Sequence, residues 1–259
     1  MEGEILNVIL QVSLLVFVVS SMLAMGLSLT VAQIIEPLRS VRLVTIGLAA
    51  NFVAVPLVGW GIAELLSLDE GLAIGLTIMA VAAGAPFLPK LAAAANGSVA
   101  FSVGLMVLLM VVTVVYMPLV LPLLISGVEV NPWDIASSLI LLMLLPLALG
   151  LLVRARYEDT ANGLQPLMTQ TSTIAIALLL VAGVIVNFDS IIELVGTGGF
   201  IAIVLFLGAA MAVGYVGGGS EPAIRSVLGL GTAQRNLSAA LVVAGQNFAD
   251  TPGVLTFII

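Results

Sequence analysis

The sequence predicts an all-α protein that crosses a membrane several times. Of its 259 residues, 61% are hydrophobic and 8% are charged, and the mean hydropathy of the chain is +1.30. Apolar segments recur along the whole length, and each approaches or exceeds the roughly 20 residues that a helix needs to cross a bilayer. These segments are continuously apolar rather than alternating, which excludes a membrane β-barrel.

Hydropathy and loop residues divide the chain into nine expected membrane spans. The opening residues lack the basic stretch of a cleaved signal, so we expect the first span to be retained. The last apolar run is too short to cross a bilayer, so we expect it to be the truncated start of a span. The spans are roughly 5–28, 43–65, 71–96, 100–126, 133–153, 166–187, 197–218 and 223–246, with the ninth starting near 252.

The charged residues in the loops predict the orientation of the spans. Arginines follow the first span, follow the fifth span and precede the eighth, and this places them all on one side. The charged residues in the loops on the opposite side are all acidic. Because cytoplasmic loops are enriched in Lys and Arg, we expect the arginine side to be cytoplasmic and the N-terminus to lie outside. The arginines are Arg39, Arg42, Arg154, Arg156 and Arg225.

The third span contains residues that interrupt a helix. Gly84 is followed by Pro86 and Pro89, and two prolines three residues apart are expected to break the span near its middle. Lys90 follows this break. It is either part of a binding site at the break or a cation at the cytoplasmic interface. The second alternative arises because about 20 helical residues, or about 30 Å, separate it from the start of the span, which is enough to reach the other side of the bilayer.

The eighth span contains a second interruption with a charge inside it. Gly231 lowers helix propensity just before Thr232, Gln234, Arg235 and Asn236. A central arginine costs roughly 2.5 to 3.5 kcal/mol on insertion scales, so an intramembrane charge is by default a candidate functional residue. Such a break predicts a solute site. The alternative is a structural arginine that snorkels or bonds to carbonyl groups at helix ends.

The composition argues against an enzyme. Cysteine and histidine are both absent, which removes disulfides, thiolate nucleophiles, imidazole bases and the usual Cys/His metal sites. An intramembrane enzyme that acts on lipid remains a minor alternative without an identifiable nucleophile and base pair. We therefore expect no metal and no resident cofactor, no nucleic-acid partner, and the lipid bilayer as the surrounding partner.

Short motifs along nearly the whole chain resemble those of the bile acid:sodium symporter family of secondary transporters. The resemblance implies two inverted repeats of five helices, with the first helix of repeat one absent here, and hence repeats over 1–128 and 129–259. It also implies a panel domain from spans 1, 5 and 6, and a core domain from spans 2, 3, 4, 7, 8 and 9 with two crossed discontinuous helices. The motifs are Met25-Gly26-Leu27, Ala50-Asn51-Phe52 through Pro56, Asn96 through Ser102, Leu144-Leu145-Pro146 through Gly150-Leu151, and Gln234 through Leu241.

The same resemblance implies which residues line the site. Asn51, Ser102, Gln234 and Asn236 match amides and a hydroxyl that line the ion and solute sites of sodium-coupled members. Those members also have a glutamate shortly before the second-break amides, where this sequence has Leu230 or Gly231. Sodium is therefore a possible coupling ion, but the carboxylate that would bind it is missing.

We therefore expect a secondary transporter of a small organic anion that works by alternating access in a bacterial inner membrane. It should not depend on sodium in the usual family manner, because Arg235, with or without Lys90, takes the place of the ions. A sodium-coupled symporter with rearranged ligands and a non-transporting sensor or scaffold of the same fold are the main alternatives. Efflux of metalloid oxyanions is disfavoured, because it would be expected to use a cysteine and the chain has none. Proton antiport is disfavoured, because it would be expected to use intramembrane aspartates and none lies in the middle of an expected span.

Overall fold

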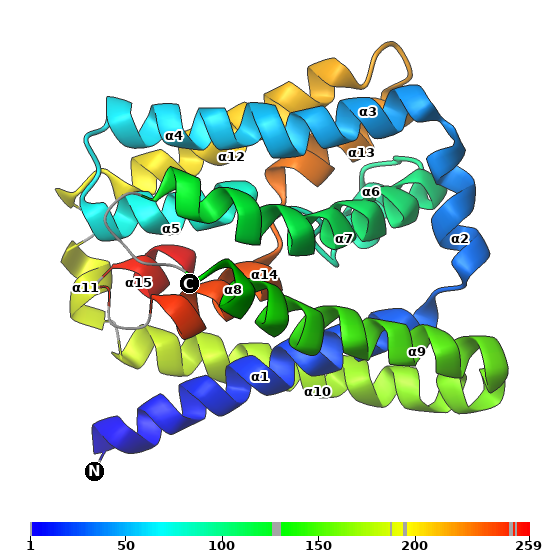
Figure 1. Cartoon of the computed structure of the whole chain (residues 1–259), viewed down its shortest axis with the longest axis horizontal. Helices are drawn as coiled ribbons and strands as arrows, with labels where there is room; N and C mark the ends of the chain where they lie inside the picture. The colour runs from blue at the N-terminus through cyan, green and yellow to red at the C-terminus, as the bar shows by residue number, and fades with distance from the viewer. Residues whose placement is uncertain (1, 126–130, 187, 194–195, 249–250, 252) are drawn as a thin grey trace.

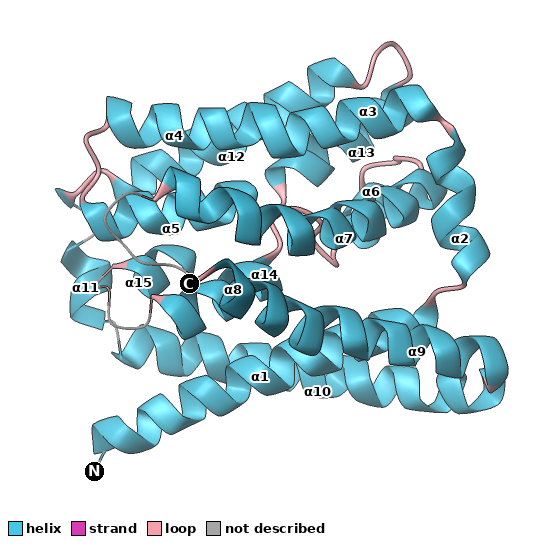
Figure 2. Cartoon of the chain, viewed as in Figure 1, coloured by secondary structure: helices cyan, strands magenta, loops and turns pink. Residues whose placement is uncertain are grey.

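The computed structural model describes the whole chain except residues 1, 126–130, 187, 194–195, 249–250 and 252. Its described residues form helices and loops and contain no strand (Figure 2). The prediction of an all-α polytopic membrane protein is confirmed by six helical segments in the described part of the chain that are long and apolar enough to cross a membrane. They are Val8–Ser28, Val41–Leu65, Val99–Leu124, Pro132–Arg156, Glu158–Val186 and Gly199–Gly217.

Several spans are composed of consecutive helical pieces. The N-terminal half contains α1 (Glu2–Ser28), α2 (Val31–Ile35), the 3-10 helix η1 (Glu36–Arg39), α3 (Val41–Ala49), the π-helix η2 (Ala50–Ala54), α4 (Val55–Leu65), α5 (Glu70–Val81), α6 (Leu88–Ala94) and α7 (Val99–Leu124). The C-terminal half contains α8 (Pro132–Leu139), the π-helix η3 (Ile140–Leu144), α9 (Leu145–Arg156), α10 (Glu158–Val186), α11 (Phe188–Glu193), α12 (Gly199–Gly217), α13 (Pro222–Ala233), α14 (Leu237–Asn247) and α15 (Val254–Ile258).

The helices form two outer groups with a central group between them. In Figure 1, α1, α9 and α10 lie along one long side of the molecule, and α3, α4 and α12 lie along the other. Helices α5, α6 and α7 lie between these sides, and α2 bridges them at one end. The contacts agree with this view, because α1 packs against α9 and α10, and α12 packs against α4 and α13.

Helix α12 shows how an almost entirely apolar sequence divides between protein and lipid. Its buried residues recur every four positions and include small side chains, which allow a neighbouring helix to approach closely. The other faces are also apolar but exposed, as expected where a helix faces hydrocarbon. The buried positions include Ala202, Phe206, Ala210 and Gly214, and the exposed ones include Ile201, Val204 and Val216.

One predicted boundary was wrong. The sixth span was expected to begin near residue 166, but α10 begins at Glu158. Hydropathy detects the apolar part of a helix, whereas the first two turns of α10 are polar. Helix α10 follows α9 almost without a loop. Across this short connection, Arg154 at the end of α9 forms an ion pair of 3.1 Å with Glu158 and also donates to Asn162. The predicted repeat boundary at residue 128 lies outside the described residues, and the division into repeats and domains remains a prediction.

Candidate functional site

The third predicted span is interrupted between α5 and α6. Helix α5 ends at Val81, and α6 begins at Leu88. Gly84 lies in the interruption with φ of +84°, a conformation that glycine adopts at no steric cost. Pro86 also lies in the interruption, whereas Pro89 lies in the first turn of α6, where the missing N–H of proline is harmless.

Thr113 of α7 holds this interruption in place. Its hydroxyl accepts a hydrogen bond of 3.1 Å from the backbone N–H of Ala83 and donates one of 3.0 Å to the carbonyl of the same residue. Both residues are completely buried, so each bond satisfies a backbone group that water cannot reach. Thr113 could not be identified from the sequence, because a single threonine in an apolar span resembles any packing residue.

The eighth predicted span is interrupted between α13 and α14. Helix α13 ends at Ala233, and α14 begins at Leu237 with Asn236 as its N-cap. The side-chain oxygen of Asn236 accepts from the backbone N–H of Ala239 at 3.1 Å. Gly231, which we expected at the break, lies inside α13 instead. Its small size serves packing, since an added Cβ would lie 3.1 Å from the side chain of Leu88.

The two interruptions meet in the interior of the protein. The backbone N–H of Asn236 donates a hydrogen bond of 2.8 Å to the carbonyl of Ala82. Asn236 is completely buried, and residues 238–244 of α14 are each at most 1% exposed. Backbone groups that each helix leaves unpaired at its break are therefore satisfied by the other break, in a region far from solvent.

Arg235 lies at this meeting point, and its guanidinium group is almost fully hydrogen-bonded to the protein. Nε donates to the carbonyl of Met79 at 2.9 Å, and Nη2 donates to the carbonyl of Ala80 at 2.7 Å. Nη1 donates to Oδ1 of Asn51 at 2.8 Å and to the carbonyl of Thr232 at 3.0 Å. Four of the five N–H donors of the group thus have partners, and the residue is only 5% exposed.

Helix ends, rather than a carboxylate, balance the charge of Arg235. Among the described residues it forms no ion pair with an acidic side chain, and the pair formed elsewhere is Arg154–Glu158. Met79 and Ala80 belong to the last turn of α5, and Thr232 belongs to the last turn of α13. A helix C-terminus is equivalent to about −0.5 charge, so the two ends together offset about one positive charge.

A π-helix presents Asn51 to Arg235. Asn51 is completely buried in η2, and its Nδ2 donates to the carbonyl of Gly47 at 3.0 Å, which fixes Oδ1 toward the guanidinium. The backbone carbonyl of the following residue, Phe52, accepts a hydrogen bond of 2.6 Å from the hydroxyl of Tyr116. Neither the π-helix nor the contact with Tyr116 was predicted from the sequence. Single π-turns are frequent at functional sites.

Two buried side-chain atoms beside Arg235 have no partner among the described residues. They are Oε1 of Gln234 and Nδ2 of Asn236. The Asn236 amide is oriented by its capping bond, so the atom without a partner is a hydrogen-bond donor. An unpaired buried donor is costly, which makes the N-terminus of α14 a candidate position for an external acceptor.

The other predicted site residues point elsewhere in this structure. The hydroxyl of Thr232 donates toward α12, with the carbonyl of Ala210 at 2.7 Å, so that only its own carbonyl faces Arg235. The hydroxyl of Ser102 donates to the carbonyl of Val99 within α7 at 2.6 Å. Lys90 lies exposed on α6 with its ammonium 5.0 Å from the centre of the Phe87 ring.

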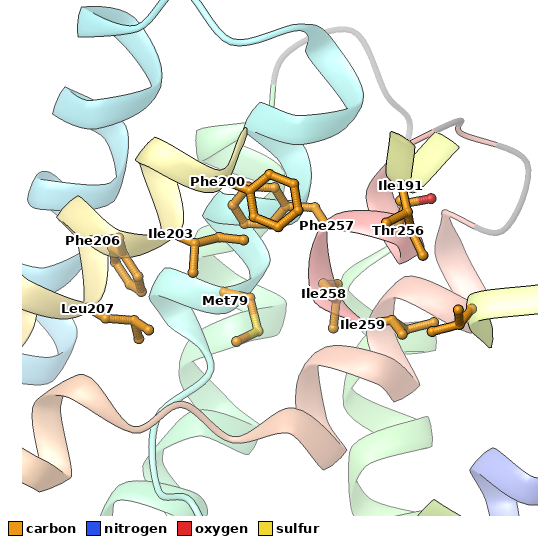
Figure 3. A pocket seen from close by; sticks show the side chains of 11 residues that line it. Met79, Ile191, Phe200, Ile203, Phe206, Leu207, Thr256, Phe257, Ile258 and Ile259 are labelled. Atoms are coloured by element: carbon orange, nitrogen blue, oxygen red, sulfur yellow. The ribbon is translucent and has the colours of Figure 1, made fainter. Parts of the chain in front are cut away.

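An apolar cavity of about 370 Å³ lies next to the meeting point and does not include its polar side chains. Residues of α5, α10, α11, α12 and the C-terminal residues line it, and Figure 3 shows Phe200, Ile203 and Phe257 around it. The side chain of Met79 reaches this cavity, while its carbonyl accepts from Arg235. The backbone at Met79 thus lies between the apolar cavity and the hydrogen bonds of Arg235.

Comparisons with known proteins identify the family of this chain and several of its relatives. Residues 14–194, more than half of the chain, match the model of the Sodium Bile acid symporter family. The chain is 25% identical over 239 residues to the probable sodium/metabolite cotransporter BASS3, chloroplastic, of Arabidopsis thaliana, which covers 90% of this chain and 56% of that relative. It is 26% identical over 166 residues to the uncharacterized sodium-dependent transporter YocS of Bacillus subtilis (strain 168), which covers 62% of this chain and 52% of that relative. The chain therefore spans about half the length of these curated relatives.

Proposed function

Because this chain belongs to the sodium bile acid symporter family, we propose that it is a secondary transporter of a small organic anion. The family and the names of its relatives support a carrier of metabolites rather than an enzyme. The proposal that the solute is an anion rests on one observation: the buried donor Nδ2 of Asn236 has no partner among the described residues.

The surroundings of Asn236 favour a negatively charged group. The residue caps α14, and the N-terminus of an 11-residue helix contributes about half a positive charge. Arg235 precedes it, and one hydrogen on its Nη2 remains after the four bonds to the protein. A carboxylate accepts from such donors. Gln234 would accept from a hydroxyl or amide of the same solute through Oε1.

We further propose that transport occurs by alternating access between two rigid groups of helices. The first, fifth and sixth spans would form the panel: α1, then α8 with η3 and α9, and then α10. The remaining spans, with both interruptions, would form the core. The dense packing of α1 against α9 and α10 supports this division. The loop arginines support a cytoplasmic assignment of their side of the membrane and an N-terminus outside.

A ligand screen tests the proposed anion. We expect short mono- and dicarboxylates, with pyruvate among them, to include at least one compound that raises the thermal midpoint of the purified protein in nanodiscs by about 2 to 4 °C at several times its Kd. The matching amide, which lacks the charge, should not do so. An amide that stabilises the protein as well as its acid does would refute the requirement for an anion.

Uptake of that compound should not require sodium. The four oxygens that could bind an ion at this position already accept hydrogen bonds from Arg235, and no carboxylate contacts it among the described residues, so this position offers sodium no free ligands. We expect proteoliposomes to take up the labelled acid at the same rate, within about twofold, when choline replaces sodium. A flux that disappears without sodium would instead support a sodium-coupled symporter with rearranged ligands.

A further inference from the structure

We infer that the guanidinium of Arg235 is the resident cation of a site built from four oxygens, and that this site binds a free monovalent cation when the side chain is removed. The oxygens are Oδ1 of Asn51 and the carbonyls of Met79, Ala80 and Thr232. We call these four atoms the oxygen cage. The inference concerns the chain's own charge and does not rest on the identity of a transported solute.

The oxygen cage has the chemistry of a cation site. All four atoms are neutral oxygens, three of them backbone carbonyls, and they lie 2.7 to 3.0 Å from guanidinium nitrogens. Carbonyls at the C-terminal ends of interrupted helices are typical ligands of monovalent cations inside membranes. Two such ends, those of α5 and α13, face the cage, so an empty cage would leave about one negative charge uncompensated.

The contacts of the cage also explain why a cation stabilises the fold here. Asn51 comes from the second predicted span, Met79 and Ala80 come from the third, and Thr232 comes from the eighth. The guanidinium is the common partner of these three segments, and it enters from the interruption between α13 and α14. Arg235 therefore joins both interrupted spans to η2 through one planar group that cannot dissociate from the chain.

Replacing the side chain should expose the cage to ions from solution. We expect Arg235→Ala in nanodiscs to have a clearly lower thermal midpoint than the wild type. Guanidinium chloride at a few millimolar, far below denaturing concentrations, should raise the midpoint of the variant by about 2 to 4 °C in a saturable manner. Sodium chloride should act similarly at higher concentration, and choline chloride should not. The wild type, whose cage is filled, should not respond to either ion.

Arg225→Ala is the matched control. Arg225 is also an arginine whose Nε donates to a backbone carbonyl, that of Tyr215 at 3.3 Å, and its guanidinium lies 4.0 Å from the centre of the Tyr215 ring. Among the described residues, this carbonyl is the one hydrogen-bond acceptor of the Arg225 side chain, so removal of that side chain should leave no oxygen cage, and guanidinium and sodium should not stabilise this variant. Equal responses of Arg235→Ala and Arg225→Ala, or no response of Arg235→Ala, would overturn the inference.

A second pair of variants decides the case if Arg235→Ala does not fold. Arg235→Lys keeps a cation, and Arg235→Met keeps most of the apolar volume without a charge. The inference requires the lysine variant to melt at a clearly higher temperature than the methionine variant. A methionine variant as stable as the lysine variant would show that the cage needs no cation. Because these measurements involve no solute, their failure would leave the transport proposal untouched, and a failed ligand screen would leave the cage intact.

Discussion

Asn51→Asp is expected to abolish most anion binding while leaving the protein folded. The new carboxylate would lie where Oδ1 of Asn51 now accepts from Arg235 at 2.8 Å, so it would form an ion pair with the guanidinium. It would also add one negative charge near the donor of Asn236. At about 8 Å and an effective dielectric constant of about 20, the repulsion of a solute carboxylate is about 2 kcal/mol. This corresponds to roughly 30-fold weaker binding.

Asn51→Ala is the control for this prediction. It also removes the hydrogen bond from Nδ2 to the carbonyl of Gly47, and it removes one partner of Arg235, but it adds no charge. We expect titration of the acid found in the ligand screen to give a much smaller loss of affinity for the alanine variant. The alanine variant should, however, melt at a lower temperature, because one N–H of Arg235 would lose its acceptor. Equal affinities of the two variants would show that the site does not attract its ligand by charge.

Gly214→Ala is expected to destabilise the protein strongly. A Cβ on Gly214 of α12 would collide with the hydroxyl of Thr232 and with the carbonyl of Leu228, both on α13. A backbone carbonyl of a helix cannot give way as the end of a flexible side chain can. The helices would have to separate, and this would also strain the hydrogen bond from Thr232 to the carbonyl of Ala210. We expect a loss of about 3 kcal/mol, or about 6 to 12 °C in the thermal midpoint.

Gly208→Ala provides a matched control on the same helix. No atom lies within 4 Å of a Cβ added to Gly208, and alanine favours a helix over glycine by about 1 kcal/mol. Its thermal midpoint should therefore stay the same or rise by about 2 to 4 °C. Thermal unfolding of both variants in the same nanodiscs is the measurement. A similar decrease for both would mean that the effect comes from α12 itself and not from its contact with α13.

The spans could be predicted from the sequence because hydropathy reports how much of a segment lies in hydrocarbon. The same signal fails where a helix extends into water, which is why the start of α10 at Glu158 was missed. It also cannot locate a break to the residue. Glycine propensity favoured Gly231, but the helix continues past it to Ala233, because tertiary packing against Leu88 outweighs a propensity difference of about 1 kcal/mol.

The polar residues at the meeting point could be identified from their types, but the partners of Arg235 could not. Asn51, Gln234 and Asn236 are amides in apolar segments and therefore stand out. Met79 and Ala80 contribute only backbone carbonyls, and a carbonyl at a helix end has no sequence signal of its own. The sequence alone therefore could not decide whether Arg235 bonds to a solute or to helix-end carbonyls, because the answer depends on where α5 ends.

The oxygen cage has a consequence for the biosynthesis of the protein. Helices α13 and α14 have 12 and 11 residues, or about 18 and 17 Å at 1.5 Å per residue, so neither can cross a hydrocarbon core of about 30 Å alone. They must enter the bilayer as one unit with Arg235 inside it. Synthesis proceeds from the N-terminus, so Asn51, Met79 and Ala80 leave the ribosome more than 150 residues before Arg235. Three of the four acceptors of its charge are thus already in the membrane when this charged segment arrives.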